Sequence, residues 1–129
     1  LHEARNSRRS TDVATLLDAL VKYQADNNGA HYSTVAAATA GNFYAIGTDA
    51  AGCNTTCTAQ TTQAACVNLS GLPANYLASI PVDPSTGTAA NTDYYLSRSA
   101  LGTLTVGACD AEGEGDGGSG TPPVIAVTR

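Results

Sequence analysis

The clearest pattern of hydrophobic and polar positions lies near the start of the chain. Apolar residues fall there on one stripe, at Val13, Leu16, Leu17, Leu20 and Val21. This i, i+3, i+4, i+7 spacing predicts an amphipathic helix over residues 3–27. The run Asn27-Asn28-Gly29 favours the left-handed conformation in which helices end. We therefore expect the chain to begin with one long helix.

The second half of the chain has the two-residue period of strands. Residues 93–99 and 102–109 alternate, and Ala100-Leu101-Gly102 lies between them as a hairpin turn. Residues 124–129 predict a last strand, and residues 42–48 are a candidate strand before the hairpin. The pattern predicts an α+β fold, with the N-terminal helix packed on a small antiparallel sheet of three or four strands.

The middle of the chain has no strong period. Residues 36–40 are a candidate short helix. Residues 49–65, rich in Thr, Ala and Gly, are expected to form a loop held by cysteines. Residues 70–87 contain three prolines and predict turns that link short packed segments. Four apolar side chains of this last segment are expected to point inward: Leu72, Tyr76, Leu77 and Ile80.

A chain of 129 residues suits one domain. We divide it into a helical part at 1–32, a variable loop region at 33–87, and a C-terminal sheet with an acidic glycine-rich loop at 88–129. Hydrophobic residues make up 43% of the chain, but there is no tryptophan, no methionine and one phenylalanine. The core must therefore be small, which favours covalent cross-links.

The chain has four cysteines, Cys53, Cys57, Cys66 and Cys109. An even number in a small chain of low charge indicates two disulfides in an extracytoplasmic protein. The alternative is a zinc site, but the spacing of the first three cysteines is unlike that of zinc sites and no histidine lies near them. Three pairings are open, and we expect Cys109 to reach back to one of the other three cysteines.

The net charge is −5, with six basic and eleven acidic residues. Binding to a nucleic-acid backbone needs clustered cations on a folded face, so no nucleic-acid partner is expected. His2 and His31 lie far apart, and the sequence contains no HExxH, P-loop or dinucleotide-binding motif. The chain is therefore not expected to be an enzyme.

The acidic loop, in which acidic residues alternate with small ones, is a candidate metal site. Oxygen ligands on a flexible backbone suit calcium, whereas the alternative is a mobile acidic surface loop. The candidate ligands are Asp110, Glu112, Glu114 and Asp116, with Asp83 and Asp93 as possible sources of further oxygens.

Two Asn-x-Ser/Thr patterns, at Asn54 and Asn68, are candidate glycosylation sites. The pattern is short and also arises by chance. If glycans were attached, they would shield a Thr-rich surface.

Two segments carry a resemblance to a known family. "EARNSRRSTDVATLLDALVKYQADNNGAHY" (3–32) resembles the lower half of the long helix of type IV pilins. "LASIPVDPSTG…TDYYL" (77–96) is similar to the segment that leads into the sheet of type II secretion pseudopilins. Residues 33–70 match nothing specific in the family. The family's peptidase site and apolar half-helix would lie before Leu1, so we expect the export signal and membrane anchor there.

The resemblance implies a structural subunit of a cell-surface, pilus-like filament. Identical subunits would pack helically outside the cell, after anchoring in the inner membrane and delivery to the pilus or secretion assembly machinery. Four charged residues at the start of the helix would form ion pairs between subunits, or else a solvated helix face: Glu3, Arg5, Arg8 and Arg9. The alternatives are a major pseudopilin of type II secretion, with calcium in its C-terminal loop, or a secreted calcium- or carbohydrate-binding module.

Overall fold

The computed structural model describes residues 1–53 and 56–129. Its first element is helix α1, His2–Asp26, which confirms the predicted N-terminal helix. The first four residues of the apolar stripe are buried, and Val21 packs against them half-buried. The helix ends as expected, because Asn28 and Gly29 adopt φ of 56° and 85°.

The described residues form a five-stranded sheet in the order β2-β1-β3-β4-β5. The strands are β1 Phe43–Ile46, β2 Thr62–Val67, β3 Tyr94–Arg98, β4 Leu104–Ala108 and β5 Ala126–Thr128. The β1–β2 pair is parallel and the other three pairs are antiparallel. The α+β class is therefore confirmed, whereas the predicted antiparallel sheet of three or four strands is wrong in strand number and in the direction of one pair.

The strand missing from the sequence prediction is β2, most of which falls in the expected 49–65 loop. Its sequence, TQAACV, has no clear alternation of strand-forming residues. Pairing with β1 holds this segment in the strand conformation that its local sequence does not favour. The chain between Ile46 and Thr62 is long enough for the crossover that a parallel pair needs. A disulfide between Cys53 and Cys66 fastens that crossover to β2.

The other predicted elements are mostly confirmed. Strands β3 and β4 form the expected hairpin, with Gly102 at φ 94° in its turn, and β5 lies within 124–129. The predicted short helix is wrong in position: α2 spans Ser33–Ala36 instead of 36–40. Its single turn forms where it buries Val35, the apolar side chain of that segment.

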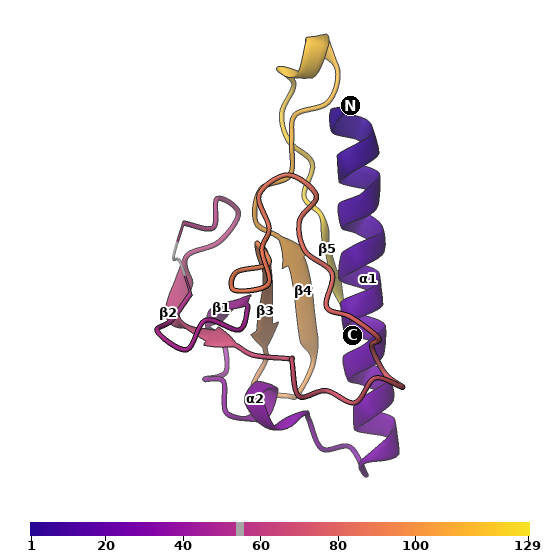
Figure 1. Cartoon of the computed structure of the whole chain (residues 1–129), viewed down its shortest axis with the longest axis vertical. Coiled ribbons are helices and arrows are strands. Elements are labelled where there is room, and N and C mark those ends of the chain that lie inside the picture. Colours follow the sequence, from indigo (N-terminus) through magenta and orange to yellow (C-terminus); the bar gives the residue numbers. More distant parts are fainter. Residues whose placement is uncertain (54–55) are drawn as a thin grey trace.

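The core lies between α1 and the sheet, because α1 packs against β4 and β5 (Figure 1). Leu104, Val106 and Ile125 face the apolar stripe of the helix in one buried cluster. The connection between β2 and β3 runs as turns; Leu72 is buried in it, and Tyr76, Leu77 and Ile80 are half-buried against the core. Within residues 1–53 and 56–129, no helix combines the length and apolar character needed to cross a bilayer.

Two disulfides join the four cysteines, Cys53 to Cys66 and Cys57 to Cys109. The prediction that Cys109 reaches back to an earlier cysteine is confirmed. Disulfides persist in oxidising compartments, so the pairs indicate an extracellular or periplasmic protein. The second pair holds the segment before β2 against the end of β4, at the base of the acidic loop.

Candidate functional site

The most distinctive polar feature of the fold lies where the first turns of α1 meet the acidic loop, at one end of the molecule (Figure 1). Asn6, Arg9 and Asp12 are all buried there. They are three residues apart, so they continue the buried face of the helix beyond Val13 and Leu16. The inward face of α1 is thus apolar in its lower part and polar in its upper part.

Arg9 forms the centre of this network. Its Nε donates to Oδ2 of Asp83 at 2.7 Å, and its Nη2 donates to Oδ1 at 3.0 Å. The exposed fractions of the two side chains are 1% and 0%. The remaining terminal nitrogen, Nη1, donates to Oε2 of Glu112 at 2.7 Å and to Oδ1 of Asn6 at 2.9 Å. One guanidinium therefore joins the helix, the 83–93 turn and the acidic loop.

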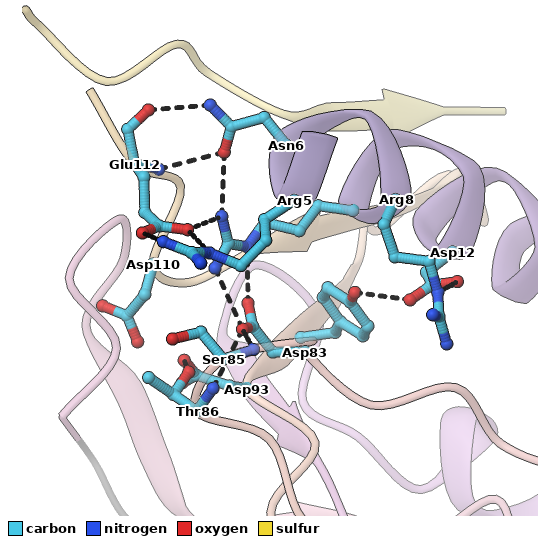
Figure 2. A network of polar contacts seen from close by, with 12 residues as sticks. Arg5, Asn6, Arg8, Asp12, Asp83, Ser85, Thr86, Asp93, Asp110 and Glu112 are labelled. Atoms are coloured by element: carbon cyan, nitrogen blue, oxygen red, sulfur yellow. Dashed lines mark hydrogen bonds and ion pairs between the residues drawn. The ribbon is translucent and has the colours of Figure 1, made fainter. Parts of the chain in front are cut away.

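Asp83 is held in place by the turn that follows it. Its Oδ1 also accepts hydrogen bonds from the backbone N–H groups of Ser85, at 2.8 Å, and Thr86, at 3.1 Å (Figure 2). Burial by itself would raise the pKa of Asp83, but the bonds from Arg9 and from these two N–H groups lower it overall. The carboxylate is therefore ionised, and the turn fixes its position against the guanidinium.

Glu112 is the second anion of the network. Arg5 binds it through two nitrogens, with Nε 2.5 Å from Oε2, and His2 Nε2 lies 3.2 Å from Oε1. The hydrogen bonds from Arg5 are the largest cause that lowers the pKa of Glu112, to about 2; burial opposes the shift and Arg9 reinforces it. Glu112 is thus ionised over the whole neutral and mildly acidic range.

Asn6 anchors the backbone of the acidic loop as well. Its Oδ1 accepts from the N–H of Glu112 at 3.0 Å, while its Nδ2 donates to the carbonyl of the same residue at 2.7 Å (Figure 2). The same Nδ2 lies 2.8 Å from Oε2 of Glu114. One amide therefore satisfies both backbone groups of Glu112, which holds the base of the loop on the helix.

A second branch connects α1 to the sheet. The Tyr94 hydroxyl donates to Oδ2 of Asp12 at 2.7 Å, and Nε of Arg8 donates to Oδ1 of Asp12 at 3.2 Å. Burial, together with the Asp12 carboxylate, raises the pKa of Tyr94 well above its ordinary value. The hydroxyl therefore remains a donor, and β3 is tied to the helix by a polar contact above the apolar core.

The structure distributes the candidate calcium ligands over different partners. Glu112 binds arginines, Glu114 accepts from Asn6, and Asp110 accepts from the Thr58 hydroxyl. Asp116 is exposed, at φ 48°. In the part of the chain that the structure describes, no three His, Cys, Asp or Glu side chains gather closely enough to hold a metal ion. Calcium binding by these acids stays a prediction.

The residues expected at a contact between subunits fall into two groups. Arg5 and Arg9 are bound within the chain, and the full burial of Arg9 removes it from any solvated helix face. Glu3 and Arg8 remain available at the surface, with 58% and 59% of their side chains exposed. Whether these two contact another copy stays a prediction.

Of the two candidate glycosylation sites, Asn54 lies outside the described residues. Asn68 is half-buried, and its Oδ1 accepts from the N–H of Ser70 at 2.8 Å. Its carbonyl accepts from the Thr34 hydroxyl at 2.9 Å. The amide nitrogen of Asn68 is the atom a glycan would need, and glycosylation stays a prediction.

The ion pairs of Arg5 and Arg9 allow the network to hold α1, the 83–93 turn and the acidic loop together. Arg9 forms an ion pair with Asp83, and Arg5 forms one with Glu112, so these charges are neutralised within a single copy of the chain. The sequence analysis missed the Arg9–Asp83 pair. One signal pointed to it, namely that Arg9 lies on the same side of the helix as the apolar residues Val13 and Leu16. Comparison of the chain with protein-family models, curated proteins and solved structures finds no match.

Proposed function

We propose that this chain is the globular part of a structural subunit of a pilus-like cell-surface filament, which assembles from copies of itself and has no catalytic role. One observation supports this most. The two segments that resemble pilins and pseudopilins, residues 3–32 and 77–96, hold each other through the Arg9–Asp83 and Asp12–Tyr94 bonds. The resemblance therefore falls on a single packed unit of the fold.

The placement of α1 also supports a filament subunit. The helix lies along the sheet beside β4 and β5, and its first turn lies at the same end of the molecule as the acidic loop (Figure 1). A subunit that contacts the next copy through two different surfaces forms an open helical array when the rotation between copies does not close into a ring. Near that end, Glu3 and Arg8 are the charged residues of the first three turns of α1 that are exposed and so available for such a contact.

The test uses the source cells. Surface filaments are sheared off, and an antibody raised against this chain is applied with gold labelling in the electron microscope. We expect label along the filament length, and we expect the gene upstream of Leu1 to encode an apolar helix after a prepilin-peptidase site. The proposal would be overturned if the chain were found as a free monomer in the medium and its gene encoded a plain cleavable signal peptide.

The second candidate is a calcium-stabilised pseudopilin of type II secretion. It is favoured by the exposed carboxylates of Glu114 and Asp116, in the loop that projects beyond the start of α1 (Figure 1). The two candidates share the fold and differ in their dependence on calcium.

A further inference from the structure

The sheet has two edges, which differ in how far the rest of the chain covers them. Strand β2 forms one edge and β5 the other. The β2 edge is partly covered, because the N–H of Cys53 donates to the carbonyl of Ala64 at 2.7 Å and the Cys53–Cys66 disulfide keeps that segment against the strand. Within residues 1–53 and 56–129, no strand pairs with the outer side of β5. The β5 edge is therefore the open one.

The direction of the backbone groups of β5 follows from its bonds to β4. Leu104 and Arg129 exchange both backbone hydrogen bonds, at 2.6 and 2.9 Å, and the N–H of Ala108 donates to the carbonyl of Ile125 at 2.9 Å. In an antiparallel pair, every second residue of a strand bonds to the same neighbour. The residues of β5 that lie between these bonding positions therefore direct their N–H and C=O groups away from β4: Ala126 and Thr128.

The β5 edge lacks the usual devices that keep sheet edges apart. Natural edges are protected by charged side chains, above all lysine, by bulges, or by a covering loop or helix. Residues 119–128 contain no charged side chain, in a chain with a net charge of −5. Ala126 and Thr128 are exposed, and Val124 has 92% of its side chain exposed. A neutral strand can therefore approach this edge without charge repulsion from it.

We propose that the β5 edge pairs with the β5 edge of a second copy, antiparallel and about a two-fold axis at Ala126. The groups left free at this edge are backbone N–H and C=O groups, so the partner must be an extended backbone. A second copy offers such a backbone in its own β5, and because both copies use the same edge, the contact closes after two copies. The inference goes beyond the filament proposal, since a contact that closes cannot extend an open array.

The register of the pair follows from the free backbone groups. With Ala126 opposite Ala126 of the second copy, these two residues exchange both backbone bonds, and Thr128 lies opposite Val124 of the second copy. Two β-branched side chains then face each other on either side of the axis, which is a favourable cross-strand pair. A shift by one residue would place the free groups of one copy opposite groups that already bond to β4 in the other copy. The register is therefore specified by the strand itself.

Helix α1 leaves room for this contact. It packs on one face of the sheet, over β4 and β5, and Val127 lies half-buried against the core on that face (Figure 1). Ala126 and Thr128 point to the opposite face, where Oγ1 of Thr128 lies 2.7 Å from Oγ1 of Thr105. Pairing through the edge therefore extends the sheet sideways and places the α1 helices of both copies on the same face.

The test is sedimentation equilibrium and NMR on the intact chain, from micromolar to millimolar concentration. We expect a monomer–dimer equilibrium and, in a mixture of labelled and unlabelled chains, an NOE between the Hα protons of Ile125 and Val127 of different copies. These residues form the pair without hydrogen bonds in the proposed register, where the Cα atoms are ~4.5 Å apart. On dilution, the amide protons of Ala126 and Thr128 should exchange faster, whereas that of Val127, bonded to β4, should keep its protection.

Ala126→Pro removes the N–H at the axis and no bond to β4, because that N–H points away from the sheet. We expect it to raise the dissociation constant of the dimer by about tenfold or more. Leu101→Ser is the matched control: it removes a side chain that is 96% exposed, in the β3–β4 turn, and should leave the dissociation constant unchanged.

A wild-type chain that stays monomeric at millimolar concentration would overturn the proposal. So would a dimer without the NOE between Ile125 and Val127, or an Ala126→Pro variant that folds and dimerises as the wild type does. The wild-type NOE decides the matter even where the variant folds poorly. Each of these results leaves the gold labelling of filaments unaffected, so the two proposals fail independently.

Discussion

Arg9 donates two hydrogen bonds to Asp83, which lies 74 positions further along the chain, and both side chains are shut off from solvent. A buried pair of this kind contributes little net stability relative to well-packed apolar residues, because both charges lose their hydration. Its value is geometric: the two parallel bonds accept one orientation of the turn against the helix. Loss of one partner leaves the other charge buried and unmatched.

The first prediction follows from that asymmetry. Arg9→Ala leaves Asp83 buried without its cation, so we expect the free energy of unfolding to fall by about 3–5 kcal/mol. Arg8→Ala is the matched control one position earlier, where the side chain is exposed, and it should cost below about 1 kcal/mol. Urea unfolding followed by circular dichroism measures both. Equal losses in the two variants would show that the buried pair does not fix the turn.

The second prediction concerns acid. The pKa of Glu112 is lowered to about 2, chiefly by Arg5, against an ordinary value of 4.5. Its ion pairs therefore contribute fully above about pH 4.5 and are lost as the pH falls towards 2. Asp83, with a lowered pKa, acts in the same direction. We expect Glu112→Gln to flatten the fall in stability below about pH 4.5.

Urea midpoints of Glu112→Gln and the wild type, compared at neutral and acidic pH, test this second prediction. Asp116→Asn serves as the control, because its exposed side chain lies in the same loop and should leave the acid dependence as in the wild type. A Glu112→Gln variant that loses stability in acid as steeply as the wild type would contradict the assignment.

Local patterns were enough to predict α1 and the hairpin of β3 and β4. The stripe of α1 and the stop at Asn28-Gly29 are contained in one segment, and so are the alternating strands around Gly102. Strand β2 could not be found this way. This segment forms a strand because it pairs in parallel with β1 and is joined to Cys53 by a disulfide. The local sequence TQAACV indicates neither of these contacts.

The polar network was out of reach for a related reason. Glu112 lies 103 positions after Arg9, and the sequence does not say which acids a given arginine meets. The local sequence does place Arg9 on the inward face of the helix, in step with Val13 and Leu16. A charged residue at such a position must find a partner, because an unpaired buried charge is too costly to keep. The existence of a partner was thus predictable, and its identity was not.

The third prediction compares the two disulfides. Cys57–Cys109 closes a loop of 52 residues and Cys53–Cys66 a loop of 13. The chain-entropy model gives stabilisations of about 4 and about 3 kcal/mol for loops of these lengths. We expect the Cys57→Ala/Cys109→Ala variant to unfold at a lower urea concentration than the Cys53→Ala/Cys66→Ala variant. The two double variants are each other's control, and a reversal of their order would show that local contacts outweigh loop closure.

The last prediction separates the two candidate functions. A calcium-stabilised pseudopilin needs several carboxylates on one ion, whereas Glu112 already gives both its oxygens to guanidinium groups. Calcium would have to displace Arg5 and Arg9 to recruit it, so we expect the Tm of the pilus-type subunit to be the same in millimolar calcium and in chelator. A rise in Tm with calcium that disappears in Glu114→Gln or Asp116→Asn would instead support the pseudopilin. Magnesium at the same concentration is the control for ionic strength, since it fits such flexible oxygen sites poorly.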